Sequence, residues 1–185
     1  MSDKIPLGVL REQIFAIPDA TVYAVLDGAS VPELPQMLAR WQIESVCLLR
    51  GELEPDVAQA APYLAVFQPE TPFAEWVLSE GWGKHWGIFA VSNANFRALR
   101  QHFRTFLMVY TPEGKPVYFR YYDPRVLRVY LPTCNAKELR IVFSPVLRYI
   151  AEDEDPMVLL KFWSDGPQCG SERVRLMRNV AQQPK

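Results

Sequence analysis

Proline interrupts this sequence often, and its positions restrict the chain to short structural elements. The 185 residues include 16 prolines. Because proline fixes its own φ angle and lacks a backbone N–H, it is accepted in the first turn of a helix, in turns and at sheet edges, but not inside a long helix. The sequence therefore predicts many short helices and strands with abrupt ends.

Short runs rich in β-branched and aromatic residues predict the strands. The clearest run is TVYAVLD, residues 21–27, which ends at the turn signal Asp27-Gly28. Single strands are also expected at 45–50, 62–67 and 88–92, with a polar connection at 51–61. Two hairpins are expected: 107–111 with 116–122, and 146–151 with 157–163.

Helix starts are marked by side chains that accept hydrogen bonds from free backbone N–H groups. Thr71-Pro72 and Asp123-Pro124 each combine a capping residue with proline at the first helical position. Ser30 and Glu33 have the spacing of a capping box. The strongest helix is expected at 95–106, and another at 136–143. Residues 171–180 fit either a basic amphipathic helix or a loose tail.

These elements predict an α+β (mixed α/β) fold: a single compact domain with a mixed sheet, two β-hairpins and several short helices. Residues 1–19 form an N-terminal extension, 20–165 the main domain and 166–185 a C-terminal tail. Division of the main domain into lobes at 20–92 and 93–165 is an open alternative.

Charge and composition exclude several classes of protein. Twenty Lys and Arg residues against 21 Asp and Glu residues give a net charge of −1, so sequence-independent binding to nucleic acid is not expected. No apolar run approaches the ~18 residues of a membrane span, and the first residues lack the pattern of a signal peptide. We therefore expect a cytoplasmic protein that binds neither nucleic acid nor membrane.

No catalytic, metal-binding or cofactor-binding residue is predicted. Cys134, His102 and Asp123 supply the residue types of a thiol nucleophile, its base and an orienting acid, but their spacing matches no local signature. The two histidines lack a partner at i+3 or i+4, and the three cysteines form no C-x-x-C pair, so a metal site and a disulfide framework are not expected. The acidic run 152–155 is interpreted as a solvated turn tip.

Two groups of arginines provide the strongest candidate for a binding surface. Arg97, Arg100 and Arg104 share one face of the helix at 95–106, which we expect to face outward. Three more arginines flank the turn at 121–123. Either both groups form a basic, aromatic-rich patch for an acidic partner or a phosphate, or the first group is a solvated helix face and the second contains a structural Arg–Asp pair. The predicted partner-binding residues are Arg97, Arg100, Arg104, Arg120, Tyr122, Arg125 and Arg128.

Four further residues are assigned structural roles. Asp123 and Pro124 start a helix, and the arginines beside Asp123 lock it in place. Trp82 and Trp86 lie in a glycine-rich loop, in which the rings are expected to fold back against the core, with a docking surface as the alternative.

The segments VYAVLDGA (22–29), GWGKHWGI (81–88), LRQHFRTFL (99–107) and YFRYYDPRVLRVYLPTC (118–134) together resemble a domain-of-unknown-function family. Its members act as adaptor chaperones for bacterial type VI secretion effectors, which are delivered toxins. The block FRYYDPRVL at 119–127 is the most specific part of this likeness, which covers about residues 20–163. The resemblance implies a non-enzymatic cytoplasmic adaptor that holds an effector, typically by the effector's N-terminal region, and helps mount it on the valine-glycine repeat spike protein VgrG.

Two other functions remain open at this stage. One is a small hydrolase or transferase that uses Cys134 or the acidic residues. The other is a regulatory module that binds a phosphorylated ligand at the arginines. For an adaptor, the binding surface is expected on the outward side of the 95–106 helix, with the 120–128 segment beside it.

Overall fold

A computed structural model of the protein describes residues 5–177. Its α-helices are α1 (Leu7–Ile14), α2 (Leu34–Arg40), α3 (Pro55–Ala60), α4 (Pro72–Trp76), α5 (Phe96–Thr105), α6 (Pro124–Tyr130) and α7 (Ala136–Phe143). A π-helical turn, Val77–Gly81, extends α4, and a 3₁₀ turn, Leu131–Thr133, extends α6. The strands are β1 (Thr21–Asp27), β2 (Ser45–Cys47), β3 (Pro62–Phe67), β4 (Gly87–Ser92), β5 (Met108–Tyr110), β6 (Pro116–Tyr118), β7 (Val146–Glu152), β8 (Val158–Asp165) and β9 (Gln168–Arg175).

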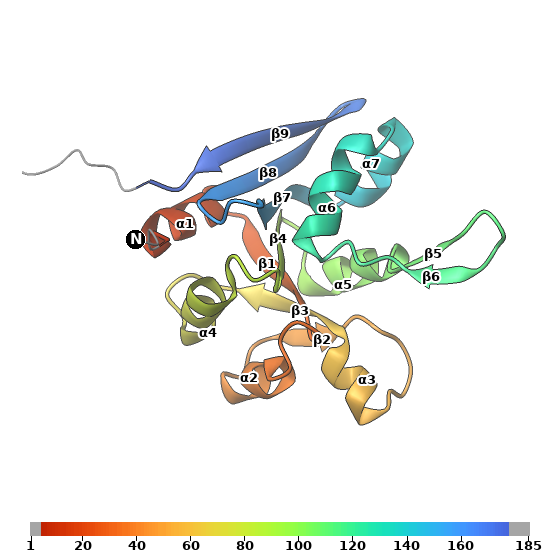
Figure 1. Cartoon of the computed structure of the whole chain (residues 1–185), viewed down its shortest axis with the longest axis horizontal. Coiled ribbons are helices and arrows are strands. Elements are labelled where there is room, and N and C mark those ends of the chain that lie inside the picture. Colours follow the sequence, from red (N-terminus) through yellow and green to blue (C-terminus); the bar gives the residue numbers. More distant parts are fainter. Residues whose placement is uncertain (1–4, 178–185) are drawn as a thin grey trace, which may run out of the picture.

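The predicted α+β fold is confirmed. Seven strands form one sheet in the order β2-β3-β1-β4-β7-β8-β9, and β5 and β6 form a separate two-stranded hairpin that projects from the body (Figure 1). Every strand pair is antiparallel, whereas a mixed sheet was expected. Because β4 pairs with β7, the segments 20–92 and 93–165 share one continuous sheet.

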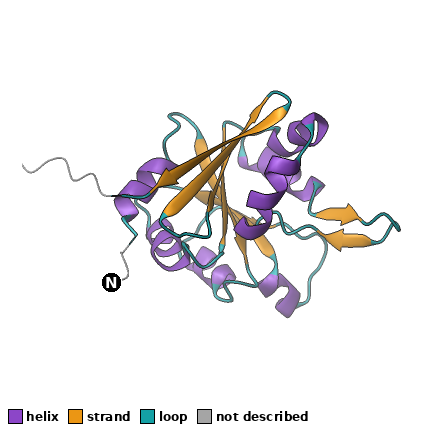
Figure 2. Cartoon of the chain, turned by 45° about the horizontal axis from the view of Figure 1, so that its top comes forward, coloured by secondary structure: helices purple, strands orange, loops and turns teal. Residues whose placement is uncertain are grey.

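The sheet has a hydrophobic core on each face. In β1, Val22 and Leu26 pack into one core while Tyr23 and Val25 pack into the other, as expected when successive side chains of a strand point to opposite faces. Helices α1, α2 and α4 contribute to the first core, and α5, α6 and α7 to the second. The molecule therefore has three layers, with helices on both sides of the sheet (Figure 2).

Three of the predicted helix starts agree with the structure. The Thr71 hydroxyl accepts a hydrogen bond from the backbone N–H of Ala74 at the start of α4. Asn95 caps α5, and Asp123 caps α6. The predicted capping box at Ser30 is wrong, because the Ser30 hydroxyl donates to the carboxylate of Asp27 and α2 begins without a side-chain cap.

Both predicted hairpins are present. The strands β5 and β6 are shorter than predicted, and β2 ends at Cys47 instead of continuing to residue 50. The connection at 51–61 contains the short helix α3, which has no buried residue. Within residues 5–177, no helix has the length and apolar character that crossing a membrane requires.

The prediction for the C-terminal segment is wrong. Residues 168–175 form β9, which pairs along its whole length with β8 and lies at one edge of the sheet. Leu176 follows the strand and is fully buried in the core that contains α1. The helical spacing of the apolar residues was misleading because β8 offers a free edge to the chain that follows it. The part of the predicted helix at 178–180 lies outside the described residues.

Candidate partner-binding surface

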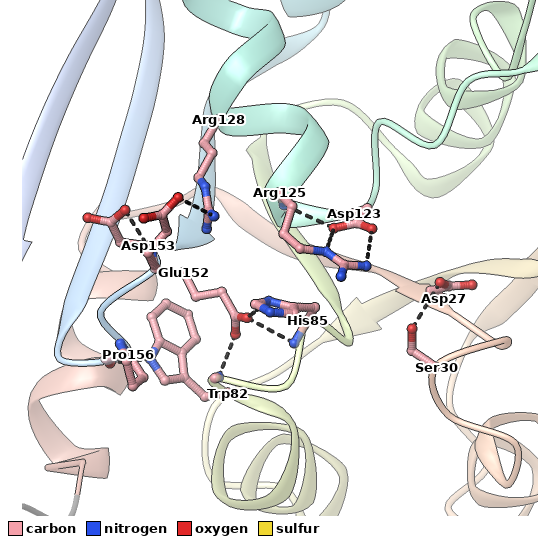
Figure 3. Close-up of polar contacts among 12 residues, drawn as sticks. Asp27, Ser30, Trp82, His85, Asp123, Arg125, Arg128, Glu152, Asp153 and Pro156 are labelled. Carbon is pink, nitrogen blue, oxygen red and sulfur yellow. Dashed lines mark hydrogen bonds and ion pairs between the residues drawn. The ribbon is translucent and has the colours of Figure 1, made fainter.

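Buried carboxylates gather at one end of the large sheet (Figure 3). Asp27 ends β1 and Glu152 ends β7; both strands run antiparallel to β4, so their last residues lie at the same end. Asp123 approaches from the start of α6. Asp27, Glu152 and Asp123 are 2%, 3% and 4% exposed. Buried charges of this kind are costly unless they are paired, so each needs nearby donors.

Asp27 is held by donors from its own turn and from a distant arginine. It accepts hydrogen bonds from the Ala29 N–H at 3.1 Å and from the Ser30 hydroxyl at 3.0 Å. Nη2 of Arg120 donates to Oδ2 of Asp27 at 2.6 Å. Arg120 is therefore engaged inside the molecule, although its side chain is 46% exposed.

Asp123 caps a helix and also forms a bidentate ion pair with Arg125. Its Oδ1 accepts from the backbone N–H of Arg125 at 2.9 Å. The Arg125 guanidinium donates through Nε to Oδ1 at 3.0 Å and through Nη2 to Oδ2 at 2.7 Å. Burial alone raises the pKa of Asp123, but the hydrogen bonds and charge of Arg125 outweigh burial and hold this pKa below its usual value.

Glu152 fastens the glycine-rich loop to the end of β7. Its two oxygens accept from the backbone N–H groups of Gly83 at 2.5 Å and of His85 at 2.8 Å, and Oε1 also contacts the His85 ring. Burial raises the pKa of Glu152, and these hydrogen bonds oppose that rise. The indole of Trp82 donates to the carbonyl of Pro156 at 2.8 Å, which ties the same loop to the β7–β8 turn (Figure 3).

The acidic run 152–155 is therefore not the fully solvated turn tip that was predicted. Glu152 and Asp153 are buried, and only Glu154 is fully exposed. No local pattern in the sequence indicates this burial, because the donors to Glu152 come from residues 67 and 69 positions earlier. Glu154 accepts from Arg128 at 3.1 Å, so all three arginines around α6 are paired with carboxylates.

The arginines of α5 differ from those around α6. Arg97 and Arg100 are exposed, and neither forms an ion pair with any residue of the described chain. Arg104 does not face outward as predicted: it is half-buried and donates to the carbonyls of Cys47 at 2.7 Å, Leu48 at 3.0 Å and Leu49 at 3.1 Å. Burial lowers the pKa of Arg104, and the nearby charges of Arg100 and Arg50 lower it further.

Three positive charges therefore lie close together beside the end of β2. No carboxylate within residues 5–177 forms an ion pair with Arg50, Arg100 or Arg104. Arg50 was not singled out from the sequence, because its neighbour Arg104 lies more than fifty residues away in the chain. The predicted patch thus divides into an unpaired group near α5 and an internally neutralised group near α6.

An exposed apolar hairpin lies next to the unpaired arginines. The hairpin β5–β6 has every strand residue exposed, including Tyr110 at 71% and Tyr118 at 61%. Its other exposed apolar residues are Met108, Val109 and Val117. A groove of about 350 Å³ separates the base of the hairpin from the segment after β2, and is lined by Leu48, Leu49, Arg50, Arg104, Leu107, Met108 and Tyr118. The sequence identified the hairpin but not its exposure.

The remaining predicted residues lie inside the protein. Tyr122, which was predicted for the binding surface, is only 6% exposed, and burial raises its pKa to about 12. Pro124 is buried in the first turn of α6. Trp82 is 6% exposed, and Trp86 is half-buried against Trp76 with their ring centres 4.8 Å apart.

The residues considered for thiol chemistry each have other partners. Cys134 is 8% exposed with Sγ directed at the carbonyl of Tyr130, and burial raises its pKa. His102 is 7% exposed, and its Nε2 lies 3.3 Å from the Tyr149 hydroxyl; burial lowers the pKa of His102 to about 4. Among residues 5–177, no cluster of three or more His, Cys, Asp or Glu side chains is arranged to hold a metal ion.

The fold and this surface define a three-layer α+β protein with an exposed aromatic hairpin beside a group of unpaired arginines. A family model matches residues 22–140, and the chain belongs to that family, which is described as domain of unknown function DUF4123. The family is associated with adaptors of type VI secretion effectors, and this association supports an adaptor role for the chain. No curated protein and no solved structure matches the chain.

Proposed function

We propose that the protein is a non-enzymatic adaptor that holds a type VI secretion effector by the effector's N-terminal region and helps mount it on the VgrG spike. Membership in a family associated with such adaptors supports this proposal. Binding of this kind needs a preformed surface with a few strong anchors rather than a reaction centre.

The observation that carries the proposal is the exposed hairpin β5–β6. Contiguous exposed apolar surface is unfavourable in water and is typical of sites that bind another protein. Tyrosine and arginine are also enriched among the residues that dominate binding energy at protein interfaces. Exposed Tyr110 and Tyr118, with Arg50 in the groove that Tyr118 also lines, combine both features.

The alternative of a cysteine-dependent hydrolase has little support from the geometry. A nucleophilic thiol needs a lowered pKa and access to substrate. Cys134 has a raised pKa and is almost fully buried, while His102 is engaged with Tyr149. The carboxylates that could act in its place are held by Arg120, Arg125 and the loop around His85.

A pull-down from the native host tests the proposal. The full chain, carrying an affinity tag, is used as bait, and a tagged unrelated protein of similar size is the control. We expect mass spectrometry to find one effector and VgrG enriched with the bait, and the purified effector to form a complex with the purified chain. Recovery of neither protein from cells that assemble the secretion apparatus would contradict the proposal.

A further inference from the structure

The hairpin β5–β6 has an edge with free hydrogen-bonding groups. The N–H of Phe119 donates to the carbonyl of Leu107, and the N–H of Thr111 donates to the carbonyl of Lys115. In an antiparallel pair the hydrogen-bonded positions alternate along each strand. The backbone groups of Met108 and Tyr110, which lie between these positions, therefore point away from β6.

The two edges of the hairpin are not equivalent. On β6 the outward positions are Pro116 and Tyr118, and Pro116 has no N–H to offer. On β5 the outward positions are Met108 and Tyr110, each with a donor and an acceptor, and neither has a main-chain partner within the described residues. An extended chain can therefore be added more completely along β5 than along β6.

Apolar and positively charged groups accompany this free edge. Met108 and Tyr118 are cross-strand partners and both line the groove, whose other wall includes Leu48 and Leu49. Arg50 and Arg104 also line the groove, and Arg100 is close enough to affect the pKa of Arg104. A segment lying there would place apolar side chains against the hairpin and acidic side chains near the guanidinium groups.

We propose that β5 binds an extended segment of the partner protein, in which apolar residues alternate with acidic ones, as an added strand. This inference rests on the proposed adaptor function and specifies where the adaptor holds its partner and what chemistry it recognises. Main-chain hydrogen bonds along Met108–Tyr110 align the partner segment with β5. The groove and the unpaired arginines Arg50 and Arg100 provide selectivity for an apolar, acidic segment.

A second copy of the chain fits this surface less well. A symmetric dimer would bring the same patch of each copy together, including its arginines. Like charges that meet across an interface without carboxylate partners are unfavourable. The unpaired positive charge therefore favours an acidic partner over a second copy of this chain.

Two substitutions at one position separate the backbone contribution from that of the side chain. Tyr110→Ala removes the ring but keeps the outward N–H, whereas Tyr110→Pro removes both. Proline is compatible with the hairpin here, because the N–H of residue 110 points away from β6 and takes no part in the β5–β6 pairing. If a strand is added along β5, Tyr110→Pro weakens binding at least fivefold more than Tyr110→Ala.

A charge reversal tests the role of the arginines. The double variant Arg50→Glu/Arg100→Glu changes two exposed side chains that form no ion pair within the described chain. Arg104 is left intact because it holds the segment Cys47–Leu49. Arg140→Glu on the exposed surface of α7 is the matched control. We expect at least tenfold weaker binding for the double variant and an unchanged affinity for the control.

Two probes are used with the full chain: the effector captured by the wild-type protein, and a labelled ten-residue peptide of alternating valine and glutamate. The same peptide with lysine in place of glutamate is the peptide control. We expect both the effector and the glutamate peptide to bind, the lysine peptide to bind at least tenfold more weakly, and both sets of variants to weaken binding without lowering the melting temperature.

The outcomes distinguish this inference from the proposed function. If the wild-type chain captures an effector and the Tyr110→Pro and double variants capture it equally well, the adaptor function stands and the β5 site is wrong. If no effector is captured, the adaptor function fails. In that case binding of the glutamate peptide would still support the β5 site, and failure of this peptide to bind would contradict it. A concentration-dependent dimer that Tyr110→Pro dissociates would identify a second copy as the occupant and overturn the inference.

Discussion

Arg120 and Asp27 lie 93 residues apart in the chain, and their side chains meet at 2.6 Å between Nη2 and Oδ2. This contact joins the segment after β6 to the end of β1. The Asp27 carboxylate is 2% exposed, whereas nearly half of the Arg120 side chain is exposed. The arginine therefore has a structural role even though it is accessible on the surface.

Removal of this arginine is expected to destabilise the fold. Arg120→Ala leaves the buried Asp27 carboxylate with only the Ser30 and Ala29 donors, so the free energy of unfolding falls by about 2 kcal/mol. Urea denaturation of the purified variants measures this change. Arg100→Ala, at an exposed arginine that forms no ion pair with residues 5–177, serves as the control and stays within about 0.5 kcal/mol of the wild type. Equal midpoints for both variants would contradict the structural role.

Substitution of Asp123 tests its two contacts at the start of α6. Asp123→Ala removes the cap and the ion pair with Arg125 and is expected to lower the free energy of unfolding by about 1–3 kcal/mol. Asp123→Asn keeps a cap oxygen and loses only the charge, so its effect is smaller. An unchanged melting temperature for Asp123→Ala would assign this residue to a binding surface instead.

The pH dependence of the Asp123 effect follows from the direction of its pKa shift. The pKa is lower in the folded state than its ordinary value of 3.8 because Arg125 outweighs burial. The stabilisation is therefore complete above pH 3.8 and is lost as the pH falls through the folded-state pKa. The difference between wild type and Asp123→Asn should shrink in unfolding curves measured at progressively lower pH below 3.8.

His102 is expected to make the fold sensitive to acid at a higher pH than Asp123 does. Burial lowers its pKa from 6.5 to about 4, so the unfolded chain takes up a proton first as the pH falls. Stability contributed by the neutral ring is complete above pH 6.5 and is lost between pH 6.5 and pH 4, by on the order of 3 kcal/mol. Urea midpoints across this range measure the loss. The variant His102→Gln should show a flatter profile, and an identical slope in both proteins would rule out His102 as the cause.

Labelling of the thiols tests whether Cys134 could act as a nucleophile. Its burial and raised pKa predict a reaction with a thiol-modifying reagent at pH 7.5 at least tenfold slower than that of free cysteine. Mass spectrometry of digests after timed labelling assigns the rate to each of Cys47, Cys134 and Cys169. Denatured protein provides the reference rate. A Cys134 that reacts faster than free cysteine would reopen the hydrolase alternative.

Neighbouring residues at the C-terminal end of β9 provide a matched test of the corrected topology. Leu176 is fully buried, whereas Met177 is 63% exposed. Leu176→Ala is expected to lower the free energy of unfolding by about 3 kcal/mol, because it leaves a cavity in the core beside α1. Met177→Ala should change it by less than about 0.5 kcal/mol. Equal, small effects would mean that this segment is not anchored in the core.

Local signals were sufficient for most of the helices and strands. Thr71, Asn95 and Asp123 each cap a helix through hydrogen bonds to residues two or three positions away, so their role is readable from the neighbouring sequence. The strand at 21–27 was recognisable because its residues favour a pleated, buried surface whatever their partners are.

The predictions that failed depended on distant residues. The C-terminal segment 168–175 became a strand because β8 offered it an edge, and local helical spacing carries no information about that edge. Arg104 turned inward because it meets three carbonyls more than fifty residues earlier in the chain. The exposure of Tyr110 and Tyr118 was also unpredictable, since a short run of apolar residues looks the same in a buried and in a projecting hairpin.

The pairing of β4 with β7 has a consequence for how this architecture can diversify. The chain leaves the sheet after Ser92, builds α5, the hairpin, α6 and α7, and returns at Val146 in the adjacent strand. This stretch is thus one continuous excursion whose entry and exit are neighbours, and Arg104 and Arg120 bond it back to the segments around β1 and β2. Changes of length are therefore tolerated more easily in the projecting hairpin β5–β6 than in α5 or the segment before α6, because insertions there would displace these contacts while those in the hairpin leave the strand order and the contacts intact.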